Sequence, residues 1–215
     1  MNRSHQHLML ERNRIRPVVV AGIGSIGTFV VYALGKAGVT DITVFDPDVV
    51  ESHNEPMSLY RNTDIGRPKV EALAERIDFE TNGTVVLKTR QERLIDQPLG
   101  RCSLILCVDR MDTGRSPIFK QVEGSVGIDV MIDTRIHQWF GEIYTIVPSL
   151  PDDCAQYRET LHPDSEVALQ ICGFHGIVSM SMAVAGDAVN ALFRYWNEGA
   201  HTWRIPRRYD RLTSA

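Results

Sequence analysis

The feature that most constrains the fold is a glycine-rich turn, GIGSIG, at residues 22–27. A short apolar run that is rich in valine directly precedes it, and apolar residues at helical spacing follow it over about 25–37. Gly38 then supplies a residue that tolerates the left-handed conformation of a helix end. A second apolar run, 41–45, ends in Asp46. This order predicts a strand, a helix and a second strand joined in one βαβ unit.

Each glycine of the turn has a physical reason to be there. Gly22 permits the tight turn, Gly24 lets a phosphate approach the backbone, and Gly27 lets the helix pack closely against the strand. The helix begins near Ser25 and Ile26, where free N–H groups and the positive end of the helix dipole favour an anion. The turn therefore predicts a phosphate-binding site.

Asp46 lies 19 residues beyond Gly27, at the end of the second predicted strand. A carboxylate in this position accepts hydrogen bonds from ribose hydroxyls, and the simpler alternative is a carboxylate that caps a turn. The turn and Asp46 together predict a nucleotide site. Taken alone, they favour a dinucleotide such as NAD and so leave an oxidoreductase open.

Strand and helix signals alternate along the rest of the chain. Apolar, β-branched runs predict strands at 85–87, 104–107, 128–132 and 142–147. Apolar residues at helical spacing predict helices from Pro68 to about 77, over about 112–122 and over 176–196. This alternation is typical of an α/β, Rossmann-like fold, with a mostly parallel sheet and helices on both faces.

We expect residues 1–215 to form one nucleotide-binding domain, since this length is ordinary for one domain. Residues 47–68 are polar and rich in turn formers, which indicates a functional loop, and the proline-rich, acidic segment 148–165 predicts a crossover loop. Residues 1–16 and 201–215 are basic, each with four arginines and one acidic residue, although the whole chain carries −4. Such segments either bind phosphates, nucleic acid or an acidic partner or remain solvated, and we expect the second, without a nucleic-acid role.

The composition excludes several classes of protein. With 43% hydrophobic and 23% charged residues, the sequence is neither fibrous nor disordered in character. No run approaches the roughly 20 apolar residues of a membrane span, and no signal-peptide pattern is present, so we expect a cytoplasmic protein. The four cysteines form no C-x-x-C pair and are expected to be reduced thiols.

Further segments carry a resemblance to a known family: VFDPDVVESHN at 44–54, DIGRPKVE at 64–71 and LCVDR at 106–110. With the glycine turn, they follow the order and spacing of the ThiF/MoeB/HesA family, the adenylating core of ubiquitin-activating enzymes. The resemblance spans roughly residues 16–147 and is weaker beyond. IDTR at 132–135 and YRETL at 157–161 are similar to short, divergent ThiF-like proteins of phages and mobile elements.

The resemblance implies a homodimeric enzyme that uses ATP and Mg²⁺ to adenylate the C-terminal carboxylate of a ubiquitin-like or sulfur-carrier protein. It assigns Lys69 to the phosphates, Asp109 to Mg²⁺ and Asn54 to the neighbourhood of the nucleotide. It also includes Asp46 and Asp48 in the nucleotide site. A flexible cation suits phosphates and a carboxylate suits Mg²⁺. The simpler alternatives are a solvated lysine, a helix N-cap and a turn-forming asparagine.

One departure from the family pattern affects the expected chemistry. Met57 stands where the family has an arginine that clamps the phosphates, and Arg61, four residues later, is the candidate replacement. Losing a cation that stabilises the transition state costs about a hundredfold or more in rate. The sequence therefore also permits a pseudoenzyme or adaptor that binds ATP without turnover. An NAD-dependent oxidoreductase is a third, weaker hypothesis, because IGRPK argues against it.

Two further family features stay open. Relatives that form a thioester use a cysteine in or near the crossover loop, so Cys154 and Cys172 are candidate nucleophiles, with a buried thiol as the alternative for Cys172. The family also uses an arginine from an N-terminal segment, for which Arg3, Arg12 and Arg14 are the candidates. The paired C-x-x-C ligands of zinc-binding relatives are missing, so we expect no structural zinc.

The last predicted helix carries an apolar stripe made of Val178, Met180, Met182 and Val184. Apolar side chains at this spacing pack into a core or form a dimer face, and the pattern alone does not separate the two.

Overall fold

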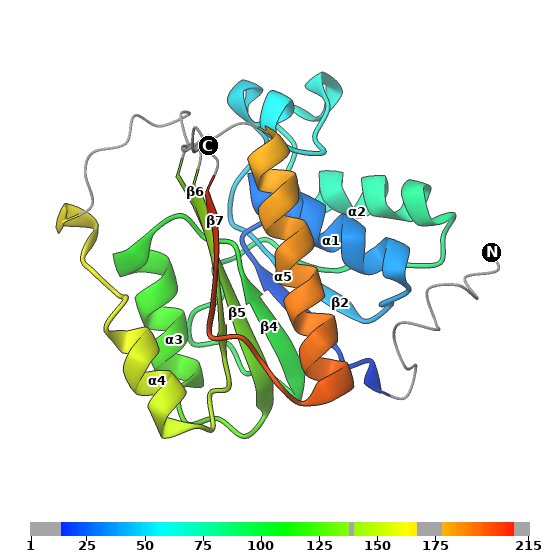
Figure 1. Ribbon diagram of the computed structural model, residues 1–215. Coiled ribbons are helices and arrows are strands. Elements are labelled where there is room, and N and C mark those ends of the chain that lie inside the picture. Colours follow the sequence, from blue (N-terminus) through cyan, green and yellow to red (C-terminus); the bar gives the residue numbers. More distant parts are fainter. Residues whose placement is uncertain (1–13, 138–139, 167–177, 209–215) are drawn as a thin grey trace, which may run out of the picture.

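The structure is a computed structural model that describes residues 14–137, 140–166 and 178–208. Its centre is a seven-stranded sheet in the order β3-β2-β1-β4-β5-β6-β7 (Figure 1). The strands are β1 (Val18–Ala21), β2 (Ile42–Phe45), β3 (Lys88–Arg90), β4 (Cys102–Leu106), β5 (Ile128–His137), β6 (Phe140–Ile146) and β7 (Arg204–Arg208). Strands β3 to β5 in this order are parallel, whereas β6 and β7 are antiparallel to their neighbours. The predicted Rossmann-like α/β fold is confirmed.

Helices cover both faces of the sheet, as predicted. They are α1 (Ser25–Ala37), α2 (Lys69–Thr81), α3 (Ser116–Val122), α4 (Pro151–Arg158) and α5 (Val178–Glu198). Figure 1 shows α1, α2 and α5 on one face and α3 and α4 on the other. Within the described ranges, no helix is long and apolar enough to cross a membrane.

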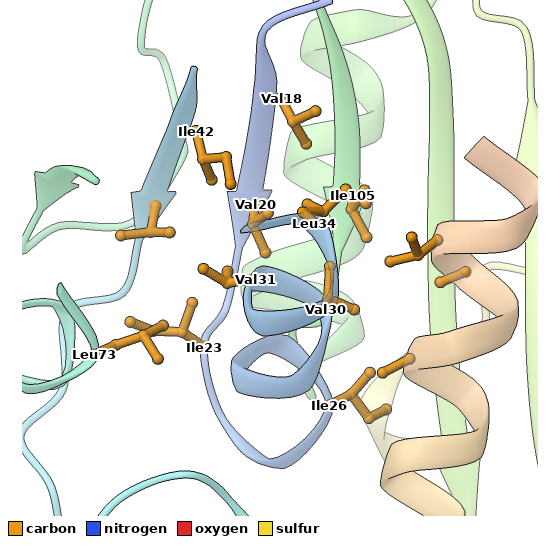
Figure 2. Packing of buried hydrophobic residues seen from close by; sticks show 14 of the residues in the cluster. Val18, Val20, Ile23, Ile26, Val30, Val31, Leu34, Ile42, Leu73 and Ile105 are labelled. Atoms are coloured by element: carbon orange, nitrogen blue, oxygen red, sulfur yellow. The ribbon is translucent and has the colours of Figure 1, made fainter. Parts of the chain in front are cut away.

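The core lies in two layers because β1 is buried on both sides. Val18 and Val20 belong to the layer under α1, α2 and α5, and Val19 and Ala21 belong to the layer under α3 and α4. Figure 2 shows the first layer, where α1 side chains such as Leu34 lie over the sheet. A strand buried on both faces is a run of apolar residues without alternation, which is the pattern that predicted β1.

Short helical turns occupy the connections. They are the 3₁₀ helices η3 (Ser52–Met57), η4 (Asn62–Asp64) and η6 (Asp164–Glu166), and the π-helical turn η5 (Met111–Arg115). Elements η3 and η4 lie in the loop predicted at 47–68, and a bridge between Val49 and Pro68 closes this loop at its base. Element η5 directly precedes α3, so the helix predicted over 112–122 is a π turn followed by a short α-helix.

Several predicted elements differ from the structure. Eight of the 18 residues in the segment expected as a crossover loop, 148–165, form α4, whose first residue is Pro151 and whose Tyr157 is fully buried. The strand predicted at 85–87 is wrong, since β3 begins at Lys88. The segment expected as a basic solvated tail, 201–215, contains β7, which pairs with β6; residues 209–215 are outside the described ranges.

Candidate functional site

The glycine turn joins the carboxyl end of β1 to α1, and two of its glycines are tightly enclosed. Gly22 has a φ of +82°, and a Cβ atom added to it would lie 2.8 Å from the Cys107 carbonyl oxygen. A Cβ atom added to Gly27 would lie 2.1 Å from the Gly22 carbonyl oxygen. In contrast, nothing lies within 4 Å of a Cβ atom added to Gly24. The turn is therefore closed toward the sheet and open at Gly24.

The turn lies where the direction of strand order reverses. From β1 the chain continues to β2 on one side and later returns to β4 on the other. The Cys107 N–H donates to the Ala21 carbonyl (2.8 Å), and the Gly22 N–H donates to the Phe45 carbonyl (2.8 Å). The ends of three neighbouring strands thus meet at one edge, which is where open α/β sheets bind ligands. The N–H groups in the first turn of α1, which begins at Ser25, have no acceptor within the helix.

Asp46 lies at this edge, and its buried carboxylate orders the backbone around it. Oδ2 accepts the N–H of Ile23 (2.8 Å), and Oδ1 accepts the N–H of Asp48 (3.0 Å). Burial raises the pKa of Asp46, while nearby Lys69 lowers it, and the net shift is upward. Asp46 therefore fixes the glycine turn directly, and the ribose contact stays a prediction.

Lys69 is the first residue of α2 and meets both aspartates. Its Nζ lies 2.9 Å from Asp48 Oδ2 and 3.9 Å from Asp46 Oδ1. The lysine is buried, whereas the Asp48 side chain is exposed. Three residues that the sequence analysis assigned to one nucleotide site are therefore in contact.

Tyr60 is a residue of this site that the sequence analysis missed. Its hydroxyl donates to the Ile23 carbonyl (2.7 Å) and lies 3.4 Å from the Lys69 carbonyl oxygen. Burial, with the carboxylate of Asp46 nearby, raises the pKa of this phenol well above its usual range. Tyr60 thus joins the loop at 47–68 to the glycine turn. No local pattern marks this role, because a tyrosine in a polar loop has no characteristic spacing.

Asn54 and Arg61 have local partners in this loop. Asn54 Oδ1 accepts the N–H of Glu51 (2.9 Å) and so stabilises η3. Arg61 Nε lies 3.3 Å from Asp64 Oδ2, and Arg61 Nη2 lies 3.1 Å from Glu75 Oε1. Arg67 binds the same two carboxylates. The guanidinium groups lower the pKa of Glu75. The structure therefore places Arg61 in an ion-pair cluster, and its contact with a phosphate stays a prediction.

Asp109 follows β4 at the same edge of the sheet as Gly22. Its side chain is 79% exposed, and its backbone oxygen accepts a hydrogen bond from Arg115 Nη1 (3.1 Å). The described part of the chain contains no group of three or more His, Cys, Asp or Glu side chains that could hold a metal ion by themselves. An exposed single carboxylate suits Mg²⁺, which keeps waters and shares substrate phosphates.

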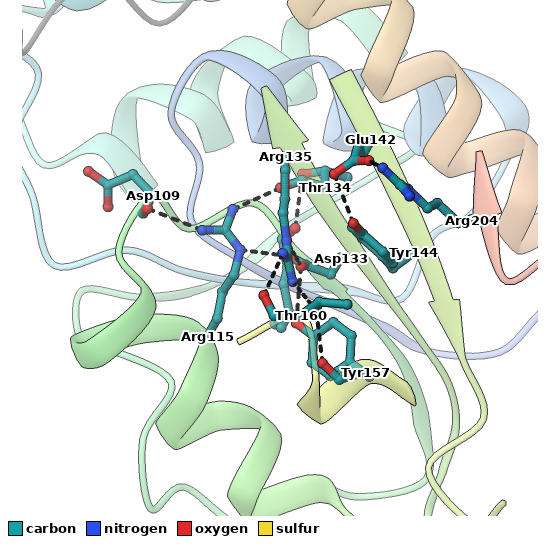
Figure 3. A network of polar contacts seen from close by, with 11 residues as sticks. Asp109, Arg115, Asp133, Thr134, Arg135, Glu142, Tyr144, Tyr157, Thr160 and Arg204 are labelled. Carbon is teal, nitrogen blue, oxygen red and sulfur yellow. Dashed lines mark hydrogen bonds and ion pairs between the residues drawn. The ribbon is translucent and has the colours of Figure 1, made fainter. Parts of the chain in front are cut away.

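Next to Asp109 lies a buried polar cluster that the sequence analysis did not predict (Figure 3). Asp133 is fully buried on β5. Its Oδ1 lies 2.9 Å from Arg115 Nε, and its Oδ2 lies 2.8 Å from Arg135 Nε and accepts the Tyr157 hydroxyl (3.0 Å). Burial would raise the pKa of Asp133, but the two guanidinium groups outweigh it and lower that pKa. The cluster is a carboxylate with both oxygens satisfied.

The same cluster brings together the segments IDTR and YRETL. Arg135 donates to the Thr160 carbonyl (3.0 Å) and to Thr160 Oγ1 (2.8 Å). Its guanidinium also lies 4.6 Å from the centre of the Tyr144 ring, a cation–π contact. Two segments more than twenty residues apart in the sequence are therefore one structural unit.

The candidate nucleophiles and the N-terminal arginines complete the comparison. The thiol of Cys154 is buried and donates to the Pro148 carbonyl (3.3 Å), and burial raises its pKa, which disfavours the reactive thiolate. Cys172, Arg3 and Arg12 lie outside the described residues. Arg14 donates to the Trp196 carbonyl (3.2 Å) near the C-terminus of α5.

Three comparisons with known proteins found relatives of this chain. The model of the ThiF family matches residues 7–193. The chain is 27% identical over 177 residues to the sulfur carrier protein ThiS adenylyltransferase of Escherichia coli K12, which covers 79% of this chain and 67% of that protein.

Solved structures share the fold. E. coli MccB with selenomethionine MccA matches with a TM-score of 0.73 and 14% identity, over 96% of this chain and 63% of MccB. The chain therefore spans less than two thirds of MccB. A structure of E. coli MccB with ATP matches with a TM-score of 0.69 and 15% identity, over 96% of this chain and 63% of MccB. E. coli tRNA N6-threonylcarbamoyladenosine dehydratase, TcdA, matches with a TM-score of 0.68 and 16% identity, over 91% of this chain and 93% of TcdA.

Proposed function

The chain belongs to the ThiF family, and from that membership we propose that it catalyses ATP-dependent adenylation of the C-terminal carboxylate of a ubiquitin-like or sulfur-carrier protein. The observation that carries the proposal is the meeting of the open glycine turn, Asp46 and Lys69 with Asp109 at one edge of the sheet. The similarity to ThiS adenylyltransferase supports the same chemistry. The partner and the turnover of ATP are part of the proposal.

The arrangement suits a nucleoside triphosphate as substrate. The open side of Gly24 leaves room for a phosphate, and the first N–H groups of α1 are donors for it. In the proposed reaction, an oxygen of the substrate carboxylate bonds to the α-phosphorus, the bond from that phosphorus to the bridging oxygen breaks, and pyrophosphate leaves. Lys69 would neutralise charge on the phosphates. Asp109 would hold Mg²⁺, which supplies further charge neutralisation when it is bound.

Lys69 already has carboxylate partners, and this affects how it would act. Its Nζ contacts Asp48 at 2.9 Å, so the proposed phosphate contact requires that the lysine share or leave that carboxylate. The Asp48 side chain is exposed, so water can solvate its carboxylate when the lysine leaves it, and breaking this ion pair costs little. We therefore propose that Asp48 holds Lys69 in place until the nucleotide binds.

A second candidate function is ATP binding without turnover. The observation that favours it is the position of Arg61, the candidate substitute for the arginine that Met57 replaces. Arg61 is bound to Asp64 and Glu75, which compete for its guanidinium. If both carboxylates retain it, the site lacks one cation for the transition state.

The test is a calorimetric titration of the purified protein with ATP and with NADH, each with and without Mg²⁺. We expect tight ATP binding that Lys69→Ala weakens by at least about tenfold, corresponding to about 1.4 kcal/mol. Lys88→Ala is the matched control, because Lys88, on β3, forms an exposed ion pair with Asp41. Preference for NADH would overturn the proposal in favour of an oxidoreductase.

Turnover is tested separately by pyrophosphate exchange with a carrier protein whose C-terminus is Gly-Gly. Exchange that Lys69→Ala abolishes supports adenylation. ATP binding without exchange, for every carrier offered, favours the binding protein without turnover instead.

A further inference from the structure

The π-helical turn η5 directly follows the Asp109 segment, and hydrogen bonds of its backbone fix it at both of its ends. At its start, the carboxylate of Asp164 accepts the N–H groups of Met111 (2.8 Å) and Asp112 (3.3 Å). At its end, the Arg115 N–H donates to the Arg110 carbonyl (3.0 Å), five residues earlier, which makes the turn a π turn. Such turns are rare in proteins, and those that do occur are often found at functional sites.

Arg115 uses three separate donors on three different acceptors (Figure 3). Nε binds the buried carboxylate of Asp133, Nη2 donates to the Thr134 carbonyl (2.9 Å), and Nη1 donates to the Asp109 carbonyl (3.1 Å). Two of these contacts are to β5 and fix the planar guanidinium, and the third holds the backbone of Asp109. A lysine in this position has a single nitrogen and cannot make the three contacts in this geometry.

The turn also lies close to the residue that precedes Asp109. A Cβ atom added to Gly114 would lie 3.0 Å from Val108 Cγ2, so the turn approaches Val108 closely. Val108 directly precedes Asp109. Arg115 therefore holds the carbonyl of Asp109, and the turn at Gly114 lies close to the side chain of the residue before it.

We infer that η5 is a positioning element for Asp109 and that Arg115 is its positioning residue, anchored on Asp133. The inference rests on the proposed role of Asp109 toward Mg²⁺. Arg115 acts through the Asp109 backbone and does not touch the nucleotide. Residues that orient a metal ligand typically affect metal affinity by about 10- to 100-fold.

Arg135 offers a matched control, because it binds the other oxygen of the same buried carboxylate but contacts Thr160 instead of Asp109. Arg115→Lys and Arg135→Lys each retain a positive charge near Asp133. A role limited to neutralising Asp133 predicts equal effects of the two substitutions. A positioning role predicts that only Arg115→Lys changes the response to the metal.

The experiment measures ATP affinity by titration calorimetry in excess Mg²⁺ and in a chelator, for the wild type and both variants. We expect the wild type and Arg135→Lys to gain affinity with Mg²⁺. Arg115→Lys should lose about tenfold or more of this gain while its affinity for metal-free ATP stays the same. Equal gains in all three proteins, or equal losses in the two variants, would overturn the inference.

Two measurements keep the result decisive. A thermal unfolding curve shows whether Arg115→Lys is folded; if it is not, Gly114→Ala replaces it, because this change displaces Val108 and leaves the Asp133 contacts in place. Retention of the full Mg²⁺ gain by Gly114→Ala then overturns the inference. Failure of the proposed function looks different: the wild type itself would bind no ATP or show no Mg²⁺ gain, and the inference would fall with it.

Discussion

Gly24 and Gly27 lie three residues apart in one turn, yet their surroundings differ in a way that separates folding from binding. Gly27→Ala would bring a methyl group within 2.1 Å of the Gly22 carbonyl oxygen. We expect it to lower the free energy of unfolding by about 1–3 kcal/mol or more. Gly24→Ala meets no atom within 4 Å, so its expected cost is only that of a poorer N-cap for α1, at most about 1 kcal/mol.

ATP affinity should respond strongly to Gly24→Ala, the variant with the smaller effect on stability. The Gly24→Ala methyl group occupies the open side of the turn, so ATP binding should weaken by about tenfold or more in a folded protein. Urea unfolding and ATP titration of the two variants measure both quantities. Unchanged ATP affinity in Gly24→Ala would show that the phosphates do not approach the turn at this glycine.

The buried carboxylate of Asp133 leads to a prediction about how the free energy of unfolding depends on pH. Its pKa in the folded protein is lowered, because Arg115 and Arg135 outweigh the effect of burial. A carboxyl with a lowered folded pKa contributes stability above its unfolded pKa of about 4, and this stability is lost as the pH falls through the folded value. Asp133→Asn should therefore cost about 3–5 kcal/mol at pH 7, because the buried Arg115 and the half-buried Arg135 lose their counterion.

The loss should shrink in acid. Denaturant unfolding of the wild type and Asp133→Asn at a series of pH values should show the two free energies approaching each other below about pH 4. Asp78→Asn, at an exposed position on α2, is the control and should follow the wild type throughout. A constant difference between wild type and Asp133→Asn down to pH 3 would contradict the prediction.

For single residues, the sequence predicts the candidate site residues that follow strands. It does not predict the residues whose hydrogen bonds fix those segments in place. Asp46, Lys69 and Asp109 stand out as candidates because each lies in a motif at a strand or helix end. Tyr60 and Arg115 could not, because their partners are backbone carbonyls and a carboxylate far along the chain. Hydrogen bonds to distant backbone atoms leave no local pattern.

Among the elements, α5 depends on one glycine of β6 for its close approach to the sheet. A Cβ atom added to Gly141 would lie 2.4 Å from Val184 Cγ2, and Val184 is fully buried in α5. Gly141→Ala should therefore displace α5 and lower the free energy of unfolding by about 1–3 kcal/mol. Gly141→Ala combined with Val184→Ala should lose less than the sum of the two single changes, since the clash is removed.

Gly186 within α5 is the matched control. A Cβ atom added to it meets nothing within 4 Å, so Gly186→Ala removes a flexible residue from a helix without a clash. It should raise the free energy of unfolding by up to about 1 kcal/mol. Denaturant unfolding of the four variants measures these changes. Equal effects of Gly141→Ala and Gly186→Ala would mean that the helix does not seat on Gly141.

The sequence predicts elements best where burial is strongest. The strands β1, β2 and β4 and the helices α1 and α2 were expected near their observed positions, because their apolar residues have one clear period. Helix α4 is not predicted, since only Cys154 and Tyr157 of its eight residues are buried and they form too short an apolar pattern. Strand β7 was also missed, because four of its five residues are exposed and polar or proline.

At the scale of the whole molecule, two arginines of the basic C-terminal segment form ion pairs with acidic residues of the sheet and of α5. Arg204 pairs with Glu142 on β6, and Arg207 pairs with Asp187 on α5. The edge strand β7 thereby connects the antiparallel end of the sheet to the helix that covers it. The excess of positive charge at this end, which the sequence predicts to lie in a solvated segment, is partly neutralised by the fold.

The apolar stripe of α5 divides into two faces, and this division carries the last prediction. Met180 and Val184 are buried against the sheet, whereas Val178 and Met182, one turn apart, are 38% and 54% exposed. We propose that the exposed pair lies in the interface of a homodimer, because an exposed apolar pair on an ordered helix is stabilised when a second copy covers it.

Met182→Glu should then weaken self-association by about tenfold or more, because a dimer would bury an unpaired charge from each copy. Val86→Glu is the control, since Val86 is 73% exposed in the connection between α2 and β3, far along the chain from α5. Sedimentation velocity over a range of concentrations measures both variants and the wild type. A dimer that Met182→Glu leaves intact would place the interface on another surface, and a wild type that stays monomeric at every concentration would exclude the dimer. The exposed and the buried pair alternate on one helix. Weakened association in Met182→Glu would therefore mean that α5 contributes to the dimer as well as to the core, and unchanged association would mean that it contributes to the core alone.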